Sequence, residues 1–484
     1  MTIAVAAAAR GDAPSLWTKL AYGFGSVAYG IKDQGFNYLL LLFYSQVIGL
    51  DARLVGLAIT AALVLDAISD PVVGYWSDNL RSRWGRRHPF MYASAIPVAL
   101  TFFMLWNPPV GWSETALFWY LLSLAVVIRT FITFYETPSS ALAPELTSDY
   151  DQRSSLLSLR FYFGWTGGNF MTVLSFMFLF PAFVTEAIPN GQFNRDAYEL
   201  YGIIASVMIF LAIIVSSLGT HSHIVRLRLP PPKRTIGLRT IFREIFETLA
   251  NRSFVALFLA AMLGAVATGL AASLSFYFST YFWGFSPQQI GWLTTCIFVS
   301  AIIGAVLAPI VTRTIGKKRG AMAIGLLAFL GAPMPIVLRL VGVLPENGDP
   351  FVFWFVLVTN MIDVGLIICF QILAAAMLAD LVEQAELRTG RRSEGIFFAA
   401  ATFIRKSVQG LGVITASFVL ALAEFPKGVD PSQVSDATLW RLGAFYVPAI
   451  LCLWMAMIAV MSTYKLDRAG HEENLRQLAA RDVG

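Results

Sequence analysis

The chain has 484 residues, of which 57% are hydrophobic and only 13% are charged. A soluble domain carries about 25% charged residues, so this sequence has about half the charge that a water-facing surface needs. These proportions exclude a soluble multidomain enzyme, a disulfide-framed secreted protein and a disordered scaffold, and they predict an integral membrane protein. The three cysteines, Cys296, Cys369 and Cys452, lie in apolar runs and are predicted to be core residues.

Twelve long apolar runs, separated by polar residues, dominate the chain. A helix that crosses the hydrocarbon core needs about 20 predominantly apolar residues, so runs of this length predict transmembrane helices. The sequence therefore predicts an all-α membrane protein with twelve transmembrane helices. In chain order, the predicted spans are 17–48, 52–77, 89–106, 115–142, 156–184, 198–218, 253–283, 288–312, 320–343, 351–380, 395–423 and 439–463.

The positive charges of the loops predict the orientation. Most Lys and Arg residues outside the spans fall in one set of loops and in the two tails, whereas the opposite loops hold only Arg53, Arg195 and Lys427. Basic loops stay in the cytoplasm, so both termini are predicted to be cytoplasmic. This distribution accounts for most of the net charge of +5 without a nucleic-acid partner.

The chain divides into two pseudo-symmetric halves joined by a basic linker. Gly74 to Arg87, after the second span, is similar to Gly304 to Arg319, after the eighth. Six spans repeated in parallel are typical of transporters whose halves rock about a site near the membrane midplane. The predicted organisation is a six-helix bundle at 1–218, a cytoplasmic linker at 219–251, a second six-helix bundle at 252–463 and a cytoplasmic tail at 464–484.

Three motifs, spread over both halves, carry a resemblance to a known family. They are Tyr22 to Gly25 followed by Lys32 and Asp33, then Asp66 to Pro71 followed by Ser82 to Gly85, and finally Ala379 to Glu383 followed by Glu394 and Gly395. Together they resemble the glycoside-pentoside-hexuronide:cation symporters of the major facilitator superfamily, which include the melibiose carrier. The resemblance covers nearly the whole chain and implies a symporter that works by alternating access.

Asp66 and Asp70 are predicted to bind the coupling ion. They are four residues apart on one helix, so their carboxylates share one face, and both cannot stay ionised in a dry site without a counter-cation. Sodium would take oxygen ligands from both carboxylates and from the hydroxyls of Ser69 and Thr133; alternatively, one carboxyl holds a proton. A structural alternative pairs Asp66 with a basic residue and lets Asp70 cap the helix near Pro71. The resemblance assigns both aspartates to the cation, although the melibiose carrier has Asn in place of Ser69.

Charged residues in the first, fourth and fifth spans are predicted to bind the substrate. Each charge near the bilayer centre costs about 2.5 to 3.5 kcal/mol on insertion scales, which favours a functional role. By the resemblance, Asp33 accepts hydrogen bonds from sugar hydroxyls, with Lys32 beside it. Glu136 replaces an aspartate that contacts sugar, and Ser140 replaces an aromatic residue that stacks on the sugar ring. The substrate site is therefore carried over, but melibiose as the substrate is not.

Arg160, in the fifth span, matches an arginine of the family's sugar site. Its planar guanidinium would also bind a carboxylate in two places, as in a hexuronide. Two alternatives remain open: Arg160 and its basic neighbours balance the acidic residues of the same half, or Asp33 forms a structural ion pair with Arg160 or Arg129.

Two further groups of charges are assigned to conformational coupling. Lys406 lies near the midplane of the eleventh span, and the resemblance implies that it links the halves by facing the carboxylate site. Arg129, in the fourth span, is predicted to share this coupling role. Charges at the loop ends are predicted to hold the inward side closed. These gate residues are Asp78, Arg81, Arg86, Asp380, Glu383 and Arg391.

The histidines offer no catalytic or metal site, since His88, His221, His223 and His471 are predicted to lie in loops or tails. The sequence therefore predicts a transporter and no enzyme, with no cofactor or resident metal and with H⁺ or Na⁺ as the coupling ion. The expected protein is a monomeric, multi-pass symporter of the plasma membrane, the inner membrane in a Gram-negative cell, that imports a glycoside, pentose or hexuronide. The alternative is a lysolipid or another amphipathic solute.

Overall fold

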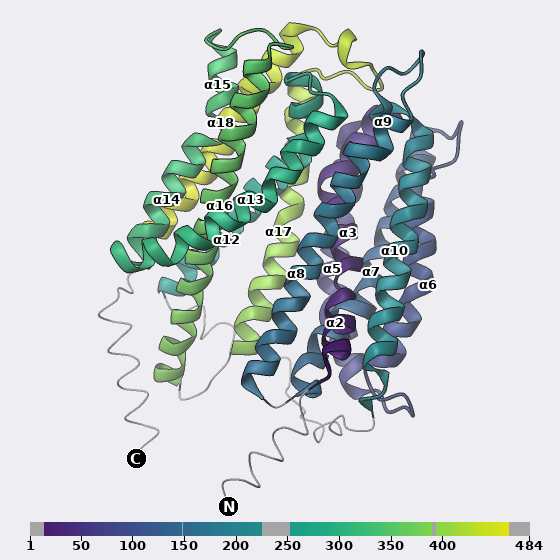
Figure 1. Ribbon diagram of the computed structural model, residues 1–484, viewed down its shortest axis with the longest axis vertical. Helices are drawn as coiled ribbons and strands as arrows, with labels where there is room; N and C mark the ends of the chain where they lie inside the picture. Colours follow the sequence, from purple (N-terminus) through teal and green to yellow (C-terminus); the bar gives the residue numbers. More distant parts are fainter. Residues whose placement is uncertain (1–13, 148, 225–251, 390–393, 464–484) are drawn as a thin grey trace, which may run out of the picture. The chain divides into compact units, whose positions relative to one another are not determined.

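The structure is a computed structural model that describes residues 14–147, 149–224, 252–389 and 394–463, without the side chains of 144, 150, 151, 154, 252–254, 378–389 and 394–407 (Figure 1). All regular elements among these residues are helical, and ten helices are long and apolar enough to cross a membrane. The helices that form these ten spans are α5 (Ala52–Asn79), α6 (His88–Leu105), α7 (Glu114–Leu146), α8 (Tyr150–Leu174), α10 (Arg195–His221), α12 (Arg252–Tyr277), α13 (Pro287–Thr314), α14 (Lys317–Gly331), α16 (Pro350–Thr389) and α18 (Asp436–Ser462).

Two further predicted spans are also helical. The eleventh coincides with α17 (Glu394–Leu422). The first, at 17–48, is a series of short segments rather than one long helix, which is why length alone does not select it as a span. The segments are α2 (Leu16–Phe24), α3 (Val27–Gln34), η1 (Gly35–Leu39), α4 (Leu40–Leu42) and η2 (Phe43–Val47), of which η1 and η2 are π-helical turns.

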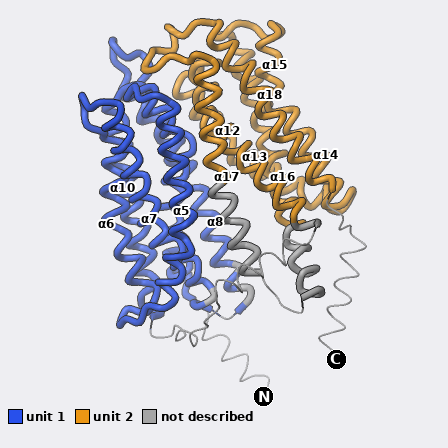
Figure 2. Tube along the Cα trace, turned by 180° about the vertical axis from the view of Figure 1, so that it is seen from behind, with its two compact units in different colours: residues 1–233 blue, residues 234–484 orange. Residues whose placement is uncertain are grey.

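The chain forms two compact units, residues 1–233 and 234–484, shown in blue and orange in Figure 2. In the first unit, α7 packs against α5 and α6, α10 packs against α6, and α8 packs against α2 and α3. In the second unit, α16 packs against α13 and α14, and α12 packs against α17 and α18. Glycine makes the closest approach possible: a Cβ on Gly30 of α3 would collide with the backbone of Gly164 on α8.

The first and seventh predicted spans, which begin the two units, end in the same kind of turn. In the first unit η2 is followed by Gly49 at φ 86°, and in the second η6 (Phe278–Phe282) is followed by Gly284 at φ 64°. A positive φ favours glycine because it lacks a Cβ. The turns share their hydrogen bonds too: N–H groups of Ile48 and Leu50 donate to the carbonyls of Phe43 and Tyr44, and those of Trp283 and Phe285 donate to Phe278 and Ser279.

The ninth predicted span, 320–343, contains a break that its apolar pattern does not reveal. α14 ends at Gly331, and α15 (Met334–Leu340) begins three residues later. Pro333 and Pro335 cause the break, because proline has no backbone N–H to donate to the carbonyl four residues earlier.

The prediction that all histidines lie in loops or tails is wrong for two of them. His88 is fully buried at the first position of α6, and His221 ends α10. His88 Nε2 lies 3.0 Å from the Thr220 hydroxyl, and Tyr92 Oη lies 2.9 Å from His221 Nδ1. These side chains pin α6 to α10 at one end of the first unit. His471 lies outside the described residues.

Candidate ion- and substrate-binding site

Two carboxylates on α5 meet a hydroxyl on α7. Asp66 and Asp70 are one helical turn apart, so both reach the same neighbouring helix. The Thr133 hydroxyl lies 3.0 Å from Asp66 Oδ1 and 2.9 Å from Asp70 Oδ1. Because a hydroxyl has one hydrogen, it is a full donor to only one carboxylate at a time. The three side chains therefore form one cluster. The charge of each carboxyl group determines which of the two accepts the hydrogen bond from the Thr133 hydroxyl.

Arg129 supplies a positive charge to this cluster. Its Nη1 lies 3.3 Å from Asp66 Oδ2, and its guanidinium carbon lies 4.7 Å from the centre of the Phe36 ring. Asp66 is 2% exposed and Arg129 3%. The structural alternative for Asp66, pairing with a basic residue, is thus present, and Arg129, predicted to link the halves, makes these contacts within the first unit. The Ser69 hydroxyl donates to the backbone carbonyl of Asp66 at 2.9 Å.

Lys32 and Asp33 pair with each other. Lys32 Nζ lies 2.7 Å from Asp33 Oδ1, although adjacent residues on a helix point about 100° apart. The ammonium is buried, with 3% of the side chain exposed, whereas the Asp33 side chain is 51% exposed. The Asp33 carboxylate is therefore accessible from outside the helix bundle, whereas the ammonium group that pairs with it is buried. The suggested pairing of Asp33 with Arg160 or Arg129 does not occur.

Arg160 on α8 is held by α7 and α3. Its Nη1 donates to the Ser139 hydroxyl at 2.8 Å, and its Nη2 donates to the backbone carbonyl of Glu136 at 3.2 Å. The guanidinium carbon lies 5.3 Å from the centre of the Tyr29 ring. A cation over an aromatic face is attracted by the ring quadrupole. Neutral hydrogen-bond partners thereby fix Arg160 beside Glu136, whose carboxylate interacts with the guanidinium electrostatically.

The two positions that depart from the melibiose carrier lie on the same helix, α7. The Glu136 side chain is half-buried and forms no hydrogen bond or ion pair with any residue that the structure describes. Ser140 is exposed, and its hydroxyl donates to the Thr137 carbonyl at 2.8 Å. Ser140 therefore stays within its own helix, whereas the Glu136 carboxylate is available to a ligand.

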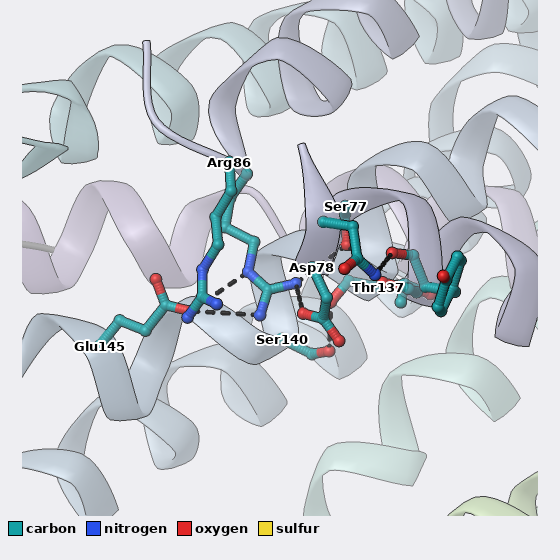
Figure 3. Close-up of polar contacts among 10 residues, drawn as sticks. Ser77, Asp78, Arg86, Thr137, Ser140 and Glu145 are labelled. Atoms are coloured by element: carbon teal, nitrogen blue, oxygen red, sulfur yellow. Dashed lines mark hydrogen bonds and ion pairs between the residues drawn. The ribbon is translucent and has the colours of Figure 1, made fainter. Parts of the chain in front are cut away.

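A second set of charges joins the end of α5, the loop after it and the end of α7 (Figure 3). Glu145 Oε1 lies 2.5 Å from Arg86 Nη2 and 3.1 Å from Arg87 Nη2. Arg87 Nη1 also contacts Asp78 at 2.6 Å and the Ser77 hydroxyl at 2.9 Å. We call these five residues the Glu145 cluster.

The predicted gate residues are only partly brought together. Asp78 and Arg86 belong to the Glu145 cluster, whereas Arg81 is exposed and makes no ion pair with a described residue. Other members of the predicted site lie outside the side chains that the structure describes: Asp380, Glu383, Arg391 and Lys406.

A family model described as MFS/sugar transport protein matches residues 21–468. The chain belongs to this family. The resemblance read from the motifs is thereby confirmed, and the protein is a multi-pass membrane transporter and no enzyme. Among solved structures, a bacterial homologue of the human lysosomal transporter Spinster is similar in fold, with a TM-score of 0.62 and 14% identity over 96% of this chain and 97% of that one.

Curated relatives match the transporter along almost its full length. The inner membrane symporter YicJ of Escherichia coli is 24% identical over 97% of this chain and 96% of its own. An isoprimeverose transporter of Lactiplantibacillus pentosus is 22% identical over 93% and 88%. A sodium-dependent lysophosphatidylcholine symporter of Danio rerio is 24% identical over 97% and 89%. Relatives of this transporter are thus named for both sugar and lipid.

Sequence reasoning missed several residues that hold the site. Ser139 and Tyr29 fix Arg160, but neither side chain is charged, so a pattern of intramembrane charges does not reveal them. Arg87 and Glu145 are the centre of the Glu145 cluster. A signal for Glu145 was available, because it lies in the segment Ala143 to Leu146, directly after the predicted fourth span at 115–142.

Proposed function

We propose that the transporter is a secondary active symporter that imports a glycoside, pentose or hexuronide together with H⁺ or Na⁺ by alternating access. The observation that carries the proposal is the Thr133 hydroxyl, which lies within hydrogen-bond distance of two carboxylates on α5. In this proposal the first and eleventh helical segments join the ten spans to make twelve, and both termini are cytoplasmic.

The carboxylate cluster suits a small cation. Asp66 already pairs with Arg129, so we expect the coupling ion to bind closer to Asp70 than to Asp66. A proton on Asp70 would donate to Thr133, whose own hydrogen then turns to Asp66. Sodium would instead take oxygens from both carboxylates and Thr133, with Ser69 as a further ligand, and it would have to tolerate the nearby guanidinium. Both ions relieve the repulsion between two carboxylates in a water-poor site.

The substrate site combines acceptors and one cation. Asp33 and Glu136 accept hydrogen bonds from sugar hydroxyls, and charge assistance makes such bonds about twice as strong as neutral ones. Lys32 holds the Asp33 carboxylate in an ion pair, and Arg160 offers a positive charge for a uronate carboxylate. Ser140 leaves room where an aromatic residue would stack on a sugar ring, so the bound sugar differs from melibiose.

The remaining charges are assigned to the conformational change. The Glu145 cluster closes one end of the first unit, and we assign it, together with Arg81, Asp380, Glu383 and Arg391, to the cytoplasmic gate. Lys406 and Arg129 transmit the state of the carboxylates to the gate. The proposed domains are 1–218 and 252–463, joined by the linker 219–251 and followed by the tail from 464.

Two experiments test the proposal. A thermal-shift screen of the purified protein against melibiose, xylose, a glucuronide and a lysophosphatidylcholine, with and without sodium, identifies the ligand class, because a ligand that binds only the folded state raises its stability. Uptake of the stabilising ligand into vesicles then follows under a proton or a sodium gradient. We expect Asp70→Asn to abolish gradient-driven accumulation and Glu186→Gln, an exposed carboxylate of the same unit, to leave it unchanged. Unchanged accumulation in Asp70→Asn would remove Asp70 from the ion site.

A lysolipid or another amphipathic solute is the second candidate. The full-length match to the lysophosphatidylcholine symporter and the missing stacking aromatic at Ser140 favour it. Two acidic side chains, Asp33 and Glu136, disfavour an anionic headgroup at the same place. Stabilisation by the lysophosphatidylcholine alone in the thermal-shift screen would establish this candidate over the sugar.

A further inference from the structure

The second unit contains a buried carboxyl group that the proposed transport site does not use. Asp363 lies thirteen residues into α16, which corresponds to a depth of about 20 Å at 1.5 Å per residue. The hydrocarbon core is about 30 Å thick, so Asp363 lies well inside it. The residue is 8% exposed, and its Oδ1 is shielded from solvent without a hydrogen-bond partner in the described structure.

Asp363 faces the break in the ninth span. A Cβ built on Gly331, the last residue of α14, would lie 3.2 Å from Asp363 Oδ1. Pro333 and Pro335 cannot donate to the carbonyls of Phe329 and Gly331, the residues four positions earlier in each case. Backbone carbonyls that lose their helical donor inside a membrane need another one. The break therefore presents hydrogen-bond acceptors next to a carboxyl group.

No positive charge in the described structure compensates Asp363. Of the helices packed against α16, α13 carries only Arg313, at its far end, and α14 carries its basic residues at its start, Lys317 to Arg319. The third, α12, carries only Arg252, its first residue, whose side chain lies outside the described part of the chain. Arg339 of α15 donates to the Pro345 carbonyl, and on α18 Arg441 pairs with Glu424. The titratable group that faces Asp363 from α18 is Tyr446, a phenol that carries no charge at neutral pH.

We propose that Asp363 is a proton-binding site, separate from the Asp66 and Asp70 pair. An isolated carboxylate in a low-dielectric site is so costly that the group takes up a proton instead. The neutral acid gains a donor, and the carbonyls at the α14–α15 break supply the acceptor. Binding and release of this proton change a contact at a helix break, and broken helices are where transporters bind coupling ions. The proposal does not depend on the transport site or on the identity of the substrate.

Infrared spectroscopy of the purified, full-length protein tests the proposal directly. A protonated carboxyl group absorbs in a region free of ionised carboxylates. The difference spectrum between the Asp70→Asn variant and the Asp70→Asn/Asp363→Asn variant should contain one protonated-carboxyl band at neutral pH, and that band should disappear at alkaline pH. The Asp70→Asn background removes the other candidate carboxylic acid. Glu346→Gln, an exposed carboxylate near the start of α16, should cause no such change.

Two results would overturn the proposal. One is a difference spectrum without a protonated-carboxyl band at neutral pH. The other is a band that vanishes on adding sodium at constant pH, since the site would then hold a metal cation. If Asp363→Asn cannot be purified, Gly331→Ala serves instead, because its methyl group approaches Oδ1 and should shift the band; an unshifted band in that variant would also count against Asp363.

Discussion

The two units treat a buried carboxyl group in opposite ways. In the first unit, Asp66 has a guanidinium at 3.3 Å and a hydroxyl at 3.0 Å. In the second, Asp363 faces a helix break without a described counter-charge. The two carboxyl groups therefore differ in their neighbours and not in their burial, since both residues are less than a tenth exposed. Asp66 has a positively charged neighbour, whereas Asp363 has none among the side chains that the structure describes.

The largest expected effect is a loss of stability when Asp66, the carboxylate with the positively charged neighbour, is replaced. Replacing Asp66 by Asn leaves the Arg129 guanidinium buried without its counter-charge, and we expect a loss of about 3 kcal/mol of unfolding free energy. Replacing Asp363 by Asn exchanges one neutral polar group for another, so the expected loss at mildly acidic pH is about 1 kcal/mol or less. Denaturant unfolding of both purified variants measures the contrast. Equal losses would contradict the distinction between the two carboxyl groups.

The same pair of variants sharpens the comparison through pH. A carboxyl group that is neutral when folded and ionised when unfolded binds more protons in the folded state, so its contribution to stability is lost as the pH rises. The wild type should therefore lose more stability than Asp363→Asn between mildly acidic and alkaline pH. Parallel stability curves of the two proteins would contradict this expectation.

A smaller effect is expected at the hydroxyl that joins the two aspartates. Thr133→Val keeps the shape of the side chain but removes its hydrogen bonds to two carboxylates, and a hydrogen bond to a charged group contributes about 1.5 to 3 kcal/mol. Thr130→Val, one turn earlier on α7, is the matched control, because its hydroxyl makes no hydrogen bond with a described residue. Denaturant unfolding should separate the two variants; identical midpoints would exclude a structural role for the Thr133 contacts.

The smallest effect is expected at the Glu145 cluster, where the carboxylate lies near a helix end instead of mid-helix. Glu145→Gln weakens contacts to both Arg86 and Arg87, and we expect a loss of about 1 to 2 kcal/mol. Arg81→Gln should change stability by about 0.5 kcal/mol or less, because Arg81 is exposed. A thermal-shift comparison of the two variants in detergent measures both losses of stability. A larger loss in Arg81→Gln than in Glu145→Gln would contradict the stabilising role of the Glu145 cluster.

The spans could be predicted because a bilayer imposes one requirement on every crossing helix, and long apolar runs satisfy it. The Asp66, Asp70 and Thr133 cluster could be predicted in part, since helical spacing places two carboxylates on one face. The partner of Asp33 could not be predicted, because a buried Lys32 ammonium turns to its chain neighbour only within a particular packing. The break after Gly331 could have been predicted from Pro333 and Pro335, because proline cannot donate the helical hydrogen bond, but the apolar pattern alone does not reveal it.

The matching turns at Gly49 and Gly284 bear on the evolutionary origin of the two units. Two segments that share a π-helical turn, a glycine and the same pair of backbone hydrogen bonds indicate that the two units have a common origin. The charges do not follow this symmetry: the Asp66–Arg129 pair belongs to one copy and Asp363 to the other. The duplicated backbone thus preserves the older inheritance, and the buried charges mark the separate specialisation of each copy.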